Sequence, residues 1–284
     1  MKRLLHIMAV SLLAGCSQPV TTDQPTITVT IEPLRYFTEA IAGDKYNVVS
    51  MVPAGTSPET YDPTPMQMVT LNKSKAYFQI GYIGFELTNL EKMKKITPQL
   101  TFYNMSENMD LIHEKHFHTD ANGHKHSHGN IEPHIWNSTK NAKQIVKNIC
   151  SALSTMDEEN SMYYAHRRDS MINIISRTDS IIRETIHQNS FLIYHPALTY
   201  FAREYLLKQI SIEKEGKEPS PAHLKELIRE CKENKVKTVF VQKEFNTSNA
   251  LIISEELDAE IVEINPLNYN WQEEMLNIAK ALGE

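Results

Sequence analysis

The chain has no excess of positive charge and no basic stripe. Its 284 residues contain 29 Lys and Arg against 35 Asp and Glu, which gives a formal net charge of −6. Because nucleic-acid binding depends on clustered Lys and Arg opposite phosphates, this balance argues against a DNA or RNA partner. With 41% hydrophobic and 23% charged residues, the composition is that of a globular protein with one large domain or two lobes.

The chain also lacks an apolar run long enough to cross a bilayer, which needs about 20 residues. Residues 4–14 are apolar, follow the positive pair Lys2 and Arg3, and end in Leu13-Ala14-Gly15-Cys16. This stretch resembles the signal of a bacterial lipoprotein, in which the cysteine is lipidated and becomes the new N-terminus. A plain secretory signal with a cysteine at its cleavage site is the alternative, and both predict export.

The lipoprotein interpretation divides the first residues into a signal peptide (1–15) and a polar tether (16–25). Cys16 is the predicted lipidation site, and stable anchoring would need more than one acyl chain. We therefore expect a cell-envelope lipoprotein on the periplasmic face or the outer surface of a bacterial membrane.

Cysteine is scarce, and neither Cys150 nor Cys231 has the Cys-x-x-Cys spacing of a thiolate metal site. We expect both to lie in helices. An exported compartment permits a disulfide between them, so their pairing stays open.

Short apolar runs alternate with amphipathic helical patterns along the chain, which predicts an α/β fold. The runs fall in two groups of four, separated by a helical pattern over 157–188 that contains no Gly or Pro. We expect two lobes, 26–156 and 189–284, each a four-stranded, mostly parallel sheet flanked by helices. The long rigid helix would join them. The expected strands are 27–31, 48–52, 76–80, 100–103, 191–194, 209–212, 238–241 and 260–264. The other expected helices are 36–42, 66–74, 87–94, 198–206, 221–234, 248–257 and 271–282.

Histidine is concentrated in the segment 113–130, which is rich in Gly, Asn, Lys and Asp and poor in apolar residues. We expect a mobile loop that binds a borderline ion such as Zn²⁺ through neutral imidazole. Binding should be weak, since each ligand taken up costs ordering entropy. A polar insertion with incidental histidines is the alternative. The histidines concerned are His113, His116, His118, His124, His126 and His128.

A tighter site should be built from fixed positions. His134 follows Pro133, and His195 precedes Pro196 at the end of a predicted strand, where ligands of open α/β sheets bind. Glu59 lies in a loop stiffened by three prolines. Each residue taken alone could equally serve a cap or the core.

Together these features resemble the metal-specific extracytoplasmic solute-binding proteins of ABC importers, the zinc- and manganese-binding family. The matching segments are residues 58–65, Glu132-Pro133-His134-Ile135-Trp136, residues 194–201 and residues 217–221, together with the connecting helix and the His-rich loop before the second segment. The resemblance covers nearly the whole mature chain. It implies one metal ion in the cleft between two lobes, with His134 and His195 as ligands.

The chain departs from the family pattern at two ligand positions. Glu59 stands where the family usually has a histidine, and Asn265 falls near the aspartate of the manganese-type members. Two His and one Glu, completed by Asn265 or water, still suit Zn²⁺. The carboxylate hardens the site towards Mn²⁺ or Fe²⁺, whereas the His-rich loop favours zinc.

The resulting prediction is a monomeric protein that captures zinc and passes it to an ABC transporter permease. It is not predicted to be an enzyme. An extracytoplasmic zinc buffer or adhesin without a transporter is an alternative. A zinc-dependent hydrolase is disfavoured, because the sequence has no His-Glu-x-x-His motif and no separate general base.

Overall fold

The computed structural model describes residues 24–119, 125–213, 219–243 and 248–283. The predicted signal peptide, the lipidation site Cys16 and His124 lie outside these ranges. So do Lys217 and Glu218 of one family-like segment.

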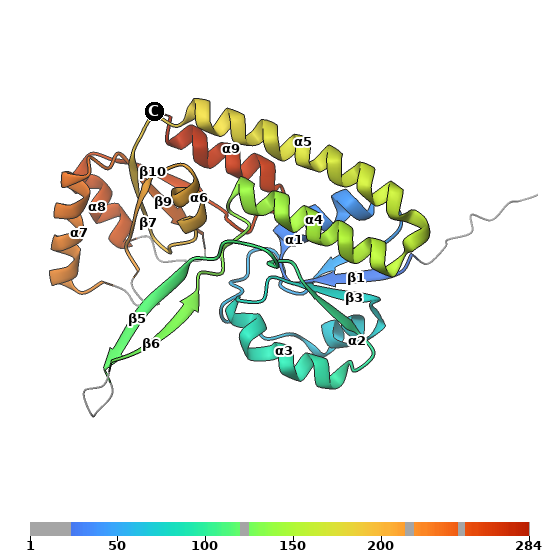
Figure 1. Cartoon of the computed structure of the whole chain (residues 1–284). Coiled ribbons are helices and arrows are strands. Elements are labelled where there is room, and N and C mark those ends of the chain that lie inside the picture. The colour runs from blue at the N-terminus through green and yellow to red at the C-terminus, as the bar shows by residue number, and fades with distance from the viewer. Residues whose placement is uncertain (1–23, 120–124, 214–218, 244–247, 284) are drawn as a thin grey trace, which may run out of the picture.

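Each lobe is built on a four-stranded sheet in which all described pairings are parallel (Figure 1). The eight predicted strands are confirmed, with ends that agree within two residues. The N-terminal sheet has the order β2-β1-β3-β4, with β1 (Thr26–Val29), β2 (Asn47–Ser50), β3 (Ala76–Gln79) and β4 (Thr101–Asn104). The C-terminal sheet has the order β10-β9-β7-β8, with β7 (Ser190–Ile193), β8 (Lys208–Ser211), β9 (Thr238–Gln242) and β10 (Glu260–Ile264).

Local capping explains where several helices begin. The Ser220 hydroxyl accepts a hydrogen bond from the His223 N–H at 3.3 Å, and Pro221 occupies the first helical position. Thr64 and Gln67 form a capping box at the start of the second helix. The flanking helices are α1 (Glu32–Ala42), α2 (Pro65–Lys73), α3 (Gly84–Ile96), α6 (Thr199–Glu204), α7 (Pro221–Glu233), α8 (Ser248–Leu257) and α9 (Trp271–Ala281).

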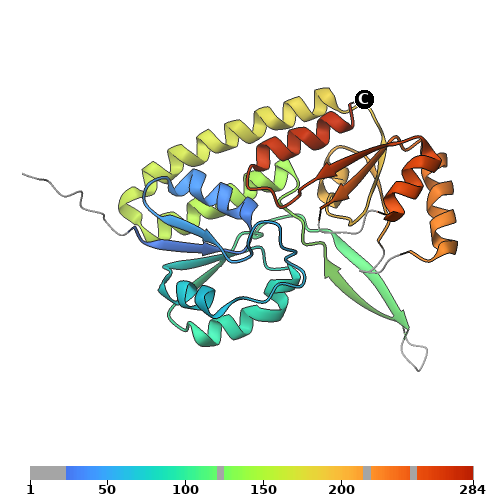
Figure 2. The same cartoon turned by 180° about the vertical axis from the view of Figure 1, so that it is seen from behind.

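The connection between the lobes is a pair of helices, where the sequence predicted one. The long helix α5 (Ser161–Thr185) runs along both lobes, and α4 (Thr139–Met156) lies beside it (Figures 1 and 2). A short 3₁₀ turn, η1 (Glu158–Asn160), separates them. Asp157 stabilises this break, because its carboxylate accepts hydrogen bonds from the Tyr164 hydroxyl and the Asn160 amide, which lower its pKa. The predicted lobe boundaries at 156/157 and 188/189 stay a prediction.

One apolar cluster continues from one lobe to the other, and a second lies within the C-terminal lobe. Two tryptophans lie at the junction: the Trp136 indole N–H donates to the Pro266 carbonyl, and the Trp271 indole N–H donates to the Trp136 carbonyl, both at 2.7 Å. Trp271 also packs against Phe37 of α1, with ring centroids 5.1 Å apart. The lobes are therefore held together by packing as well as by the chain.

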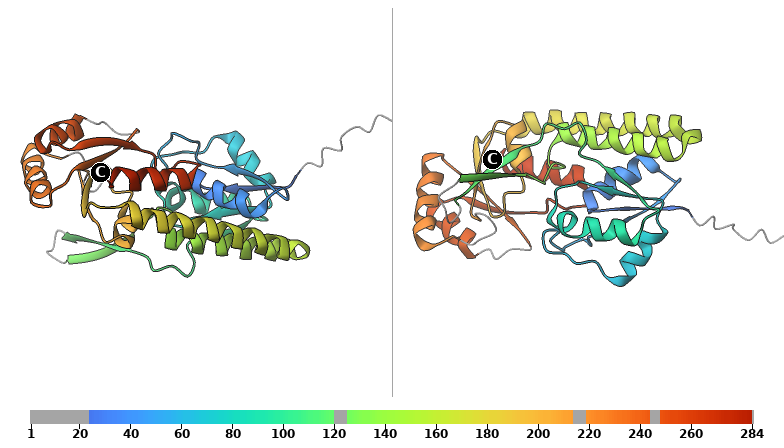
Figure 3. Two further views of the ribbon diagram at one scale, coloured as in Figure 1. Left: turned by 90° about the horizontal axis from the view of Figure 1, so that it is seen from above. Right: turned by 60° about the horizontal axis from the view of Figure 1, so that its bottom comes forward.

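The His-rich segment is an antiparallel hairpin in its described part, a correction to the predicted loop. The strands are β5 (His113–Thr119) and β6 (Lys125–Ile131), and they project from the body on the side of the C-terminal lobe (Figures 1 and 3). The Ile112 N–H donates to the Tyr200 hydroxyl at 3.1 Å, and the Glu132 N–H donates to the Ile112 carbonyl at 3.0 Å. These hydrogen bonds fix the base of the hairpin. The loop was predicted from the low apolar content of the segment, which does not indicate such bonds.

Cys150 in α4 and Cys231 in α7 are buried free thiols, so no disulfide joins them in this structure. Burial raises the pKa of Cys231 to about 12. Across the described residues, no helix has the length and apolar character needed to span a membrane.

Candidate metal site

His134 is held by a carboxylate two residues before it. Glu132 accepts hydrogen bonds from the His134 backbone N–H at 2.9 Å and from ring atom Nδ1 at 2.6 Å. Both residues are buried. The Tyr200 hydroxyl of α6 donates to the Glu132 carbonyl at 2.9 Å, which fastens this segment to the C-terminal lobe. The imidazole is therefore fixed with Nε2 directed away from Glu132.

The pKa of Glu132 lies below its ordinary value. Burial alone would raise it, but the neighbouring His134 imidazole and the hydrogen bonds from His134 outweigh burial. Glu132 is therefore an anion at neutral pH, and its charge favours the tautomer of His134 that carries the proton on Nδ1.

His195 is fixed in the same manner in the other lobe. It follows β7, and its Nδ1 lies 2.9 Å from Glu213 Oε2, a residue just beyond the neighbouring strand β8. The side chain of Gln242, at the end of β9, accepts from the His195 N–H at 3.2 Å and donates to its carbonyl at 2.7 Å. In this sheet the strand order reverses between β7 and β9, the usual ligand position in such folds.

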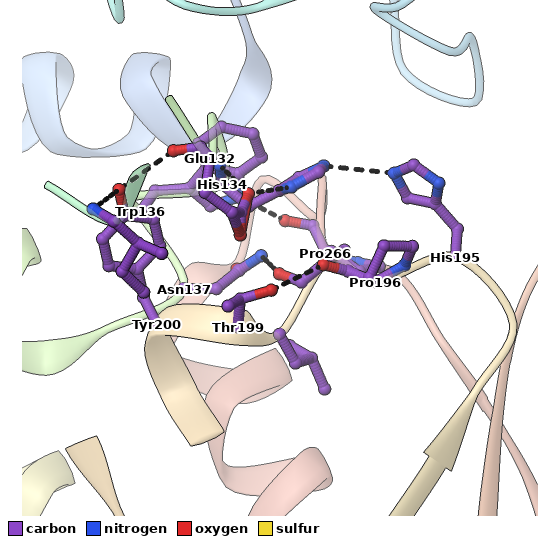
Figure 4. Close-up of polar contacts among 12 residues, drawn as sticks. Glu132, His134, Trp136, Asn137, His195, Pro196, Thr199, Tyr200 and Pro266 are labelled. Atoms are coloured by element: carbon purple, nitrogen blue, oxygen red, sulfur yellow. Dashed lines mark hydrogen bonds and ion pairs between the residues drawn. The ribbon is translucent and has the colours of Figure 1, made fainter. Parts of the chain in front are cut away.

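The two imidazoles face each other across the lobes, with Nε2 of His134 3.4 Å from Nε2 of His195 (Figure 4). Two nitrogens that each lie 2.0–2.1 Å from one tetrahedral ion are roughly 3.3 Å apart. The carboxylate beside each Nδ1 favours the tautomer that carries its proton there, which leaves both Nε2 lone pairs for a metal. The pair therefore has the separation that two ligands of one zinc ion need.

The four residues predicted as ligands all line one cavity of about 40 Å³. The two histidines face each other in this cavity, with their Nε2 atoms 3.4 Å apart. Glu59 Oε2 accepts a hydrogen bond from the Gly84 N–H at 3.2 Å, and Asn265 Oδ1 accepts one from the Leu267 N–H at 3.1 Å. Within the described ranges, no group of three His, Cys, Asp or Glu residues is close enough to hold an ion.

Residues 27–282 match the model of the family described as the periplasmic zinc-uptake complex component A, ZnuA. This match covers most of the chain. The chain belongs to the ZnuA family.

Two relatives align with nearly the whole of this chain. The high-affinity zinc uptake system protein ZnuA of Bacillus subtilis is 28% identical over 279 residues, covering 93% of this chain and 87% of that protein. The zinc-binding lipoprotein AdcA of Streptococcus pneumoniae is 25% identical over 285 residues, and the alignment covers 95% of this chain but 56% of AdcA.

Solved structures give the same result for the fold. A crystal structure of ZnuA has a TM-score of 0.81 and 31% identity, covering 92% of this chain and 98% of that one. A ZnuA deletion mutant with zinc bound has a TM-score of 0.79 and also 31% identity, covering 92% of this chain and 97% of that one. The two-lobed α/β architecture of the ZnuA family is thus confirmed for this chain.

The sequence did not single out the residues that hold the two histidines. Glu132 belongs to a family-like segment that assigns it no role, and no sequence pattern points to Glu213 or Gln242. Glu132 could have been found, since a carboxylate two residues before a candidate ligand can reach its ring. Glu213 carries a weaker signal, since its closeness to His195 follows from the pairing of β7 with β8.

The hairpin register groups four of the auxiliary histidines. His116 pairs with His128, and His118 pairs with His126. Alternate positions of a strand share a face, so these four positions lie on one face of the ribbon.

Proposed function

We propose that this ZnuA-family protein captures zinc outside the cytoplasm and delivers it to an ABC importer. The observation that carries the proposal is the His134–His195 pair, whose Nε2 atoms lie 3.4 Å apart. The family description and the names of the relatives, which are zinc-uptake and zinc-binding proteins, support the same function.

In this proposal His134 and His195 bind the ion, and Glu59, which lines the same cavity, provides a third ligand. Glu59 would exchange its hydrogen bond with Gly84 for the ion. Asn265 or water would complete four ligands. The paired imidazoles favour zinc, whereas the carboxylate would also suit Mn²⁺ or Fe²⁺.

The proposed partner is the permease of an ABC transporter, because the relatives include substrate-binding lipoproteins of metal ABC transporters. We further propose that Cys16 carries the lipid anchor, and that the protein acts as a monomer in the cell envelope. An uptake component needs no catalytic step, and the histidine pair serves reversible binding.

The deciding experiment is calorimetric titration of the chelator-stripped chain from Ser17 onward with zinc and with manganese. Wild type, a deletion of residues 114–130 and Glu59→Ala are compared. One tight zinc site that survives the deletion and weakens in Glu59→Ala supports a capture protein. Loss of all binding with the hairpin would instead favour a zinc buffer that acts through its histidines.

The hairpin is expected to bind additional zinc weakly. Four histidine positions on one face can supply imidazoles, and each ligand taken up costs ordering entropy. Deleting residues 114–130 should therefore remove the weak component of the zinc isotherm and leave the tight component unchanged. A hairpin variant with His116, His118, His126 and His128 replaced by Gln should behave like the deletion.

Replacing Glu213 with Gln should weaken zinc binding about 10- to 100-fold, the usual effect of removing a carboxylate behind a metal-bound histidine. The amide oxygen can still accept from Nδ1 of His195, but without a negative charge it no longer raises the basicity of Nε2. Competition with a chromogenic chelator measures the change. Glu226→Gln, on the exposed face of α7, is the matched control and should leave affinity unchanged. Equal affinities for Glu213→Gln and wild type would exclude this role.

A further inference from the structure

Glu86 is a buried carboxylate at the centre of the N-terminal lobe. It is the third residue of α3 and is 1% exposed. Its partners, Thr30 and residues 80–81, directly follow β1 and β3, the two strands between which the sheet order reverses. This is the position where open α/β sheets usually bind a ligand. Here the protein fills it with its own side chain.

Three donors converge on this carboxylate. Oε1 accepts from the Thr30 hydroxyl and from the Ile80 N–H at 2.8 Å, and Oε2 accepts from the Gly81 N–H. The Thr30 hydroxyl is in turn 2.7 Å from the Tyr77 hydroxyl. Burial raises the pKa of Glu86, although these donors oppose the rise. Since buried polar groups are costly without partners, the contacts fix the turn between β3 and α3 in one position.

The residues after that turn, at the start of α3, contact the segment that contains Glu59. The Gly84 N–H donates to Glu59 Oε2 at 3.2 Å, and the Phe85 N–H donates to the Pro58 carbonyl at 2.9 Å. A Cβ on Gly84 would lie 2.5 Å from Glu59 Oε2 and 2.8 Å from the Glu59 carbonyl oxygen. The Glu59 segment therefore packs directly on the first turn of α3, two residues from Glu86.

We propose that Glu86 is a positioning residue for the metal site, which acts by setting where Glu59 stands relative to His134 and His195. The inference rests on the proposed role of Glu59 as a ligand. Among the described residues, Glu59 is the one carboxylate on the cavity wall. The position of Glu59 thus sets whether a carboxylate oxygen reaches the ion. An oxygen ligand shifts the preference from zinc towards the harder Mn²⁺.

The test is a double-mutant cycle of Glu86→Gln and Glu59→Ala in the chain from Ser17 with residues 114–130 deleted. Gln keeps the shape of Glu86 but turns an NH₂ group towards N–H donors. Glu86→Gln should weaken zinc binding about tenfold and change the zinc-to-manganese affinity ratio. In the Glu59→Ala background it should change neither, while the thermal shift it causes should be the same in both backgrounds.

A purely structural Glu86 gives a different pattern. An equal loss of zinc affinity in both backgrounds, or no loss in either, overturns the inference. So does a Glu59→Ala variant that binds zinc like wild type, although zinc binding that depends on His134 would then still support the proposed function. If Glu86→Gln does not fold, Thr30→Val removes one donor and should reproduce the same dependence on Glu59 at smaller amplitude.

Discussion

Replacing His134 with alanine is expected to lower zinc affinity more than about 100-fold. This exceeds the loss expected when a residue that hydrogen-bonds a metal ligand is replaced. His134 supplies one of the two Nε2 atoms that lie 3.4 Å apart, and no other described His, Cys, Asp or Glu forms a three-membered group with the pair. His195→Ala should have the same effect. Titration in the background lacking residues 114–130 isolates this site from the hairpin.

His166 provides the matched control, because it is an exposed histidine of α5 that does not line the cavity of the pair. His166→Ala should bind zinc like wild type and unfold at the same temperature. If His134→Ala kept tight, stoichiometric zinc binding, the imidazole pair would not be the capture site.

Replacing Trp271 with alanine should destabilise the protein by about 3–5 kcal/mol, the range for removing a large buried aromatic side chain. The indole packs on Phe37, and its N–H is bonded to the Trp136 carbonyl at the joint between the lobes. For a chain of this length, the loss corresponds to a fall in melting temperature of roughly 6–15 °C. Calorimetric or circular-dichroism melting of the zinc-free protein measures it.

Trp271→Phe separates packing from hydrogen bonding at this joint. It keeps an aromatic ring against Phe37 but leaves the Trp136 carbonyl without its donor, which should cost about 1–2 kcal/mol. An alanine variant that melts within a degree or two of wild type would show that this contact does not hold the lobes together.

Much of the fold could be predicted because its signals are local. Strands such as Thr238–Gln242 are short apolar runs, and Ser220-Pro221 marks a helix start that the structure confirms with a hydrogen bond. The connector was predicted less well. A helical pattern over 157–188 predicts α5 but does not mark the bounds of α4, and the break at Asp157 depends on a side-chain hydrogen bond from Tyr164 that no apolar period indicates.

The candidate site was predicted in part. His134 follows Pro133 just past the His-rich segment, and His195 ends a predicted strand before Pro196. The two do face each other in the structure. Glu59 and Asn265 line the same cavity, but their side-chain oxygens are bonded to backbone groups, a choice that no sequence pattern indicates. Their role as ligands remains a proposal.

The sequence by itself determined the two-lobed α/β architecture, the ZnuA-like motifs and the two histidines, because hydrophobic period, caps and motif spacing act over a few residues. Only the tertiary structure decided the 3.4 Å separation of the imidazoles and the hairpin form of the His-rich segment. It also decided the pairing of His195 with Glu213. These features depend on residues far apart in the chain, such as Trp136 and Trp271, and packing across the core brings them together.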